Sequence, residues 1–115
     1  MIKLYLHEYT VTPKDEDRKP ITIKVEEGSM TFNDKVIEDK EILKLIDDLI
    51  FSNKEKLLRF KDVELQNAKG GRQLQLSVFA SEILEEKVTL IGNSNNAEVN
   101  SFYSDFRDKL LEILK

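Results

Sequence analysis

The spacing of the hydrophobic residues changes along this chain, and that change restricts the fold more than any other feature. Near the start, Ile2, Leu4 and Leu6 alternate with other residues, and a period of two predicts a β-strand over residues 2–11. Near the end, apolar residues recur every third or fourth position, which is typical of an α-helix. A chain with both periods is expected to fold as a sheet covered by helices.

Further strands are expected wherever the alternation returns. Residues 21–26 form one such strand, and Met30 and Phe32 mark a short one that ends at Asn33-Asp34. Turn residues lie between these two strands, so they are expected to form a hairpin. Later strands are centred on three groups of apolar residues: Val63 and Leu65; Leu74, Leu76 and Val78; Val88 and Leu90.

Two segments carry a helical stripe. The first covers residues 40–51, with Asp39 as its N-cap, because a carboxylate there can accept a hydrogen bond from a free first-turn N–H. The second covers residues 96–114, about 28 Å at the rise of an α-helix. Asn95 is its expected N-cap, with Glu98 three residues later. Its stripe consists of Val99, Phe102, Tyr103, Phe106, Leu110, Ile113 and Leu114.

The middle of the chain is less clearly patterned. Residues 54–60 fit either a helix or the start of a strand, and the sequence leaves both open. Gly70 and Gly71 predict a turn, because glycine adopts positive φ without steric cost. The strand at Val63 and the strand at Leu74 are therefore expected to form another hairpin, which gives the order β-β-β-α-β-β-β-α.

These elements predict one α+β domain over residues 1–115. It has two layers, a mostly antiparallel sheet of five to six strands and two helices on one face. The alternative is a strongly bent sheet closed by the C-terminal helix. It arises because residues 88–114, a strand, an Asn-rich loop and a long aromatic helix, resemble the end of pleckstrin-homology domains. The predicted helix at 40–51 is not part of that resemblance.

Composition limits the chemistry and the location. The chain has 115 residues, a net charge of −4 and no cysteine, which excludes disulfides, thiolate nucleophiles and Cys-ligated metals. Because Met1 is followed at once by the first alternating segment, we expect no secretory signal and a cytoplasmic location. Lysine outnumbers arginine, a bias often found in AT-rich bacterial or phage genomes.

No catalytic constellation emerges from the sequence. His7, the single histidine, shares its side of the first strand with Tyr5 and Tyr9, and packing is a simpler interpretation than general base catalysis. Adjacent carboxylates such as Asp47-Asp48 diverge on a helix, which indicates solvated surface. Phosphate-loop, nucleophile-elbow and metalloprotease motifs do not occur. We therefore expect no enzymatic activity, no cofactor and no metal.

A basic segment suggests one candidate site, for nucleic acid or anionic lipid. Residues 53–72 carry 6 basic and 3 acidic side chains within an acidic chain, and such a cluster can bind phosphates. Against nucleic acid, no exposed aromatic side chain alternates with these residues to stack on bases. The candidates are Lys54, Lys56, Arg59, Lys61, Lys69 and Arg72.

The preferred hypothesis is a non-enzymatic module that binds another protein. Charged residues fill the segment between Pro13 and Pro20, and an exposed loop of this kind can speed association with a charged partner. A stoichiometric inhibitor of the immunity-protein, antitoxin or phage anti-defence type fits a compact chain without catalytic motifs. A homodimer through an edge strand is an alternative. The expected contact residues are Asp15, Glu16, Asp17, Tyr5, His7 and Tyr9.

Overall fold

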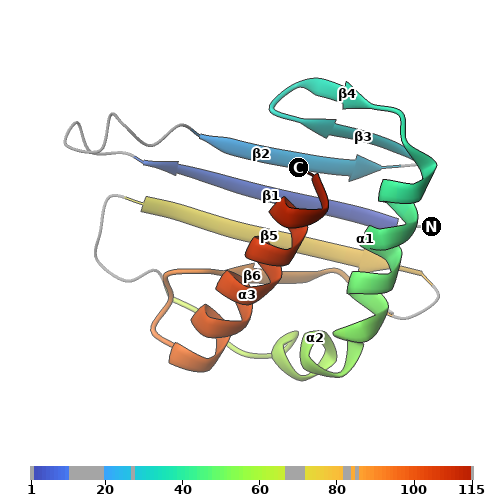
Figure 1. The fold of residues 1–115 in the computed structure, drawn as a ribbon. Coiled ribbons are helices and arrows are strands. Elements are labelled where there is room, and N and C mark those ends of the chain that lie inside the picture. Colours follow the sequence, from blue (N-terminus) through green and yellow to red (C-terminus); the bar gives the residue numbers. More distant parts are fainter. Residues whose placement is uncertain are drawn as a thin grey trace.

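The computed structural model describes residues 2–10, 20–26, 28–66, 72–81, 84 and 86–114. These residues form a two-layer α+β structure with three helices on one face of a six-stranded sheet (Figure 1). The strands are β1 (Ile2–Thr10), β2 (Ile21–Glu26), β3 (Ser29–Phe32), β4 (Lys35–Ile37), β5 (Arg72–Ala80) and β6 (Val88–Ile91). The helices are α1 (Lys40–Ser52), α2 (Lys54–Phe60) and α3 (Ala97–Leu114).

The sheet is open and antiparallel throughout. Its strand order is β4-β3-β2-β1-β5-β6, so β1 is an interior strand with β2 on one side and β5 on the other. Because the sheet keeps two edges, at β4 and β6, it is not the closed, strongly bent sheet of the pleckstrin-homology alternative. The α+β class and the antiparallel sheet predicted from the sequence are confirmed.

The core lies between the sheet and the helices. Leu6 stands opposite Ile23 on β2 and Leu76 on β5, and all three side chains are fully buried. Ile46 and Ile50 of α1 are buried in the same core. The apolar face of the strands and the apolar stripe of α1 therefore pack together in one layer. The buried side chains of α3 are Val99, Phe102, Tyr103, Phe106 and Leu110.

The order of elements differs from the prediction in the middle of the chain. Residues 54–60 are helical, because Leu57 and Phe60 lie one turn apart and both are buried. Residues 61–66 form no strand, so the expected hairpin with β5 is wrong. Instead β5 pairs with all nine residues of β1. Val63 and Leu65 pack against the core as half-buried side chains without joining a ladder.

The sequence pattern also did not predict the fourth strand, β4. Asn33 and Asp34 end β3 as expected, but both have positive φ, 49° and 69°, and they turn the chain directly into β4. A two-residue loop with this geometry matches the twist of a hairpin. The β4 strand has only three residues, and its central Val36 is 58% exposed. So short a strand shows no alternation of apolar and polar residues in the sequence. The observed order is therefore β-β-β-β-α-α-β-β-α.

One helix cap is confirmed and the other is displaced by one residue. The Asp39 side chain accepts a hydrogen bond from the Glu41 backbone N–H at 2.9 Å, as predicted. On α3 the cap is Asn96, whose side-chain oxygen accepts from the N–H groups of Glu98 and Val99. Asn95 instead exchanges two hydrogen bonds with the backbone of Gln66, which ties the start of α3 to the segment after α2.

The turn between β3 and β4 provides a stability test. The Asn33 side chain accepts a 2.7 Å hydrogen bond from the Thr22 backbone N–H, whereas no such contact is found for Asp34 among the described residues. Glycine suits positive φ at both positions, but only Asn33→Gly removes a hydrogen bond. We expect Asn33→Gly to be less stable than Asp34→Gly by about 1 kcal/mol in urea unfolding. Equal midpoints for the two variants would contradict a stabilising role for the Asn33 side chain.

Candidate functional site

The face of the sheet turned away from the helices, here called the open face, carries a row of ring side chains. On β1, Leu4, Leu6 and Glu8 point into the core, so the alternate residues point outwards. These are Tyr5, His7 and Tyr9, which we call the aromatic row. Tyr5 is 37% and Tyr9 is 40% exposed, large fractions for tyrosines in the interior strand of a sheet.

The rings of the aromatic row contact one another along the strand. The Tyr5 and His7 rings are stacked, with centroids 5.8 Å apart and planes 13° apart. The His7 and Tyr9 centroids are 4.8 Å apart with tilted planes. The His7 Nδ1 atom lies 3.2 Å from the Thr22 hydroxyl on β2, which holds the middle ring in place. The structure thus brings these three sequence-predicted site residues together.

Polar side chains flank the row on both neighbouring strands. Lys24 and Ser77 stand opposite Tyr5, and Thr22 and Gln75 stand opposite His7. Directly opposed residues in an antiparallel sheet share a face, so these groups border the rings. The surface therefore combines flat apolar rings with hydroxyl and amide groups that can donate or accept hydrogen bonds.

A shallow depression lies at the Tyr5 end of the row, here called the lysine depression. Glu26 lies between two of its lysines: its carboxylate is 3.7 Å from the Lys3 Nζ and 3.5 Å from the Lys24 Nζ. Three lysines against one glutamate make the described part of the depression basic, although the whole chain carries −4. Its lining residues are Lys3, Leu4, Tyr5, Lys24, Val25, Glu26, Gln75, Ser77, Phe79 and Lys87.

The cations of the basic segment that belong to α2, Lys54, Lys56 and Arg59, lie elsewhere, on the helical layer. The Lys54 ammonium is 5.2 Å from the Phe51 ring centroid and the Lys56 ammonium is 6.0 Å from that of Phe102. Arg59 forms an ion pair with Glu98 of α3, and its guanidinium also stacks on a ring. These cations therefore contact their own chain, and α2 does not bring them to the aromatic row.

The other candidate residues are only partly described. Lys61 is exposed directly after α2. Lys69, the side chain of Arg72, and Asp15, Glu16 and Asp17 of the acidic loop lie outside the described residues. The hypotheses that rest on them stay predictions.

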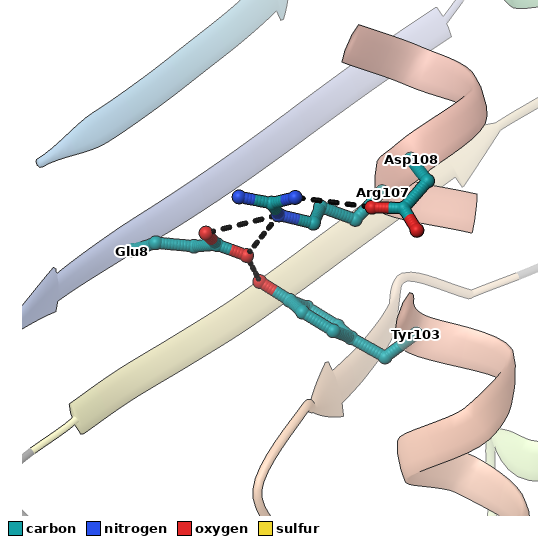
Figure 2. Close-up of polar contacts among 4 residues, drawn as sticks. All are labelled: Glu8, Tyr103, Arg107 and Asp108. Carbon is teal, nitrogen blue, oxygen red and sulfur yellow. Dashed lines mark hydrogen bonds and ion pairs between the residues drawn. The ribbon is translucent and has the colours of Figure 1, made fainter. Parts of the chain in front are cut away.

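A buried polar cluster that the sequence patterns did not predict lies on the other side of β1. The Glu8 carboxylate, 7% exposed, accepts a 2.7 Å hydrogen bond from the Tyr103 hydroxyl and bonds of 3.0 and 3.1 Å from the Arg107 Nε (Figure 2). Arg107 also donates to Asp108 at 3.0 Å. Glu8 occupies an inward position of the Leu4-Leu6-Glu8 alternation, and a carboxylate there was the available signal that it needs a partner.

This cluster is an anchor between sheet and helix. Burial lowers the pKa of Arg107, but hydrogen bonds and charge from Asp108 and Glu8 outweigh it and hold the pKa above its ordinary value. Arg107 is therefore cationic throughout the working pH range, and it compensates the charge of Glu8. The cluster joins β1 to α3 (Figure 2). It lies on the opposite face from the aromatic row, because Glu8 alternates with His7 and Tyr9 along β1.

The described residues contain neither a metal-binding cluster nor a membrane-spanning helix. No group of three or more His, Cys, Asp or Glu residues within these ranges is arranged to hold a metal ion. None of the helices in the described ranges is sufficiently long and apolar to span a membrane.

Comparison with known proteins adds no assignment. The chain matches no family model, no curated protein and no solved structure. The candidate site therefore stands on its geometry: an exposed aromatic row with a basic depression at one end.

Proposed function

We propose that the protein binds single-stranded nucleic acid on the open face of its sheet, as a non-enzymatic module. The observation that carries this proposal is the aromatic row, three adjacent rings on the exposed side of an interior strand. Unpaired bases stack on exposed aromatic rings in proteins that bind single strands. Alternate residues of a strand are spaced about 6.8 Å apart, so their rings form a row along the strand. A duplex does not expose its base faces, so the row favours a single strand.

A site for single-stranded nucleic acid also needs hydrogen-bonding groups and cations, and the surroundings of the row supply both. The flanking Thr22, Ser77 and Gln75 offer hydroxyl and amide groups for the edges of unstacked bases. Lys3, Lys24 and Lys87 offer cations for the backbone. The objection drawn from the sequence was that no aromatic residue accompanies the basic segment. On the open face rings and cations come together, but they come from β1, from β2 and from the residue directly before β6.

Loss of the two tyrosines tests the stacking directly. We expect Tyr5→Ala/Tyr9→Ala to weaken binding of a labelled 12-nucleotide oligo-dT by tenfold or more, since each stacked base contributes about 1–3 kcal/mol. Tyr5→Phe/Tyr9→Phe keeps both rings and should bind within about threefold of the parent. Fluorescence anisotropy gives the affinities. Phe51→Ala, which removes a 60% exposed ring from the helical layer, is the matched control and should change nothing.

The tyrosine emission of the protein gives an independent readout. The chain has no tryptophan and three tyrosines, two of them in the row and the third, Tyr103, buried. Stacking of bases on the row should therefore quench most of the exposed tyrosine signal. Binding that leaves the emission unchanged, or that survives Tyr5→Ala/Tyr9→Ala, would contradict the proposed mode.

The second candidate is a protein partner on the same face, as for a stoichiometric inhibitor of the immunity-protein, antitoxin or phage anti-defence type. Tyrosines such as Tyr5 and Tyr9 are favoured anchors of protein interfaces, and this observation keeps the candidate open. Affinity capture from host lysate at low and high salt separates the two. A single protein retained at high salt by the parent, and lost with Tyr5→Ala/Tyr9→Ala, favours this candidate. Nucleic acid recovered only at low salt favours the first.

A further inference from the structure

We infer that the lysine depression binds the terminal phosphate of a nucleotide, at the end of a strand or on a free mononucleotide. This inference rests on the proposed function, because it assigns one end of the same surface. Among the described residues, the depression is lined by Lys3, Lys24 and Lys87, with Glu26 as the single carboxylate. The described lining therefore has a formal charge of +2. A phosphomonoester carries about −1.5 to −2 at neutral pH, whereas a phosphate inside a strand carries one negative charge.

The contacts of Glu26 leave the lysines available for an anion. Its carboxylate is 3.7 Å from Lys3 and 3.5 Å from Lys24, longer than the roughly 2.7–2.9 Å of a strong charge-assisted hydrogen bond. The side chains of Lys3 and Lys24 are 48% and 57% exposed, and exposed ion pairs of this kind contribute little. Both ammonium groups can therefore turn towards a phosphate at small cost.

The position of the depression links phosphate to base. Tyr5 belongs both to the lining of the depression and to the aromatic row, so a base on Tyr5 places its own phosphate beside the lysines. Phe79, which stands opposite Lys3 on β5, adds a second ring to the lining. Ser77 and Gln75 add neutral hydrogen-bonding groups. These parts fit one nucleotide with an exposed phosphate group.

The charge along the row is asymmetric, and this places the strand end. In the described strands, the neighbours of the far half of the row are uncharged: Thr22 and Gln75 opposite His7, and Gln73 opposite Tyr9. Among the described residues, a strand that crosses the row thus meets concentrated positive charge at the Tyr5 end. The geometry points to a bound strand whose phosphorylated terminus lies at Lys3 and whose following bases lie towards Tyr9.

The test compares probes that differ only in their ends. Oligo-dT with a 5′-phosphate, with a 3′-phosphate and with two hydroxyl ends is titrated into the full chain, together with thymidine monophosphate and thymidine. We expect one phosphorylated oligonucleotide to bind about tenfold more tightly than the hydroxyl-ended one. We also expect the monophosphate to bind more tightly than the nucleoside. Comparing the phosphorylated oligonucleotide with thymidine monophosphate separates a strand end from a free nucleotide as the natural ligand.

Charge variants at the depression show where the preference arises. Lys87→Gln and Lys24→Gln should each remove most of the preference for a phosphorylated end and lower the salt slope by about one. Glu26→Gln, which raises the charge of the depression, should strengthen binding of the phosphorylated probe. Lys44→Gln on α1 makes the same charge change on the helical layer and is the control. All four positions are on the surface, so their folding is readily confirmed by circular dichroism.

The outcomes separate this inference from the proposed function. Oligonucleotides that bind equally with and without a terminal phosphate would overturn the inference and leave the proposed function intact. Binding of the monophosphate, lost in Lys87→Gln, without binding of any oligonucleotide would support the phosphate site and overturn the single-strand proposal. Binding of none of the probes would overturn both, as expected for a protein partner.

Discussion

Replacing Arg107 with methionine is expected to destabilise the protein by about 3–5 kcal/mol, the largest effect of any single change considered. Methionine keeps much of the apolar stem but removes the cation, and the Glu8 carboxylate, 7% exposed, then has no positive partner in its cluster. An unpaired buried carboxylate costs far more than the loss of an exposed ion pair. Urea unfolding at neutral pH gives the difference in the free energy of unfolding.

The partners of Arg107 provide the controls. Tyr103→Phe removes only one hydrogen bond to Glu8 and should cost about 1–2 kcal/mol. Glu8→Leu/Arg107→Leu removes both charges and should recover most of the stability lost in Arg107→Met, because a buried ion pair can be exchanged for apolar side chains at little cost. A double variant as unstable as Arg107→Met would show that the buried charge is not the cause.

Replacing Gly92 with alanine is expected to cost about 2–3 kcal/mol, because the new methyl group would overlap a buried ring. A Cβ at this position would lie 2.4 Å from Cδ1 and 2.5 Å from Cε1 of Tyr103. Tyr103 is 1% exposed and also hydrogen-bonds to Glu8, so it has no free space into which to move. The thermal midpoint and the urea midpoint should both fall.

A double-mutant cycle identifies the overlap as the cause. In a Tyr103→Leu background the ring is absent, and Gly92→Ala should cost much less than in the parent. Gly28→Ala is the comparison for backbone strain, because Gly28 has φ of +77° but nothing within 4 Å of its Cβ position. An equal cost of Gly92→Ala with tyrosine and with leucine at position 103 would rule out the steric explanation.

The helices show which features the local sequence pattern could predict. The stripes of α1 and α3 predicted both helices to within one residue at each end, because a helical period uses residues close together in sequence. Segment 54–60 stayed ambiguous, since a single pair, Leu57 and Phe60, forms its buried side. The sequence placed the cap of α3 on Asn95, but the next residue is equally suited, and Gln66 takes the side chain of Asn95.

The candidate site also combines residues that the sequence pattern predicted with residues that it did not. Alternation on the first strand was sufficient to place Tyr5, His7 and Tyr9 on one side, and the structure confirms that their rings are neighbours. Two of their charged neighbours were not predictable from it. Lys24 comes from β2, and Lys87 directly precedes β6, two strands away from β1. Lys54, Lys56 and Arg59 of the basic segment, which stands out in the linear sequence, lie on α2 instead.

By itself, then, the sequence determined β1, β2, β3, β5, β6, α1 and α3 and their apolar faces, because these follow from periods of two and of three to four residues. Only the tertiary structure decided the order of the strands. That order pairs β5 with β1, leaves residues 61–66 without a strand and sets the lysine depression beside Tyr5. It also brought Glu8 to Tyr103 and Arg107, 95 and 99 residues away. Such contacts depend on which faces meet when the chain packs, and no local spacing of residues records that.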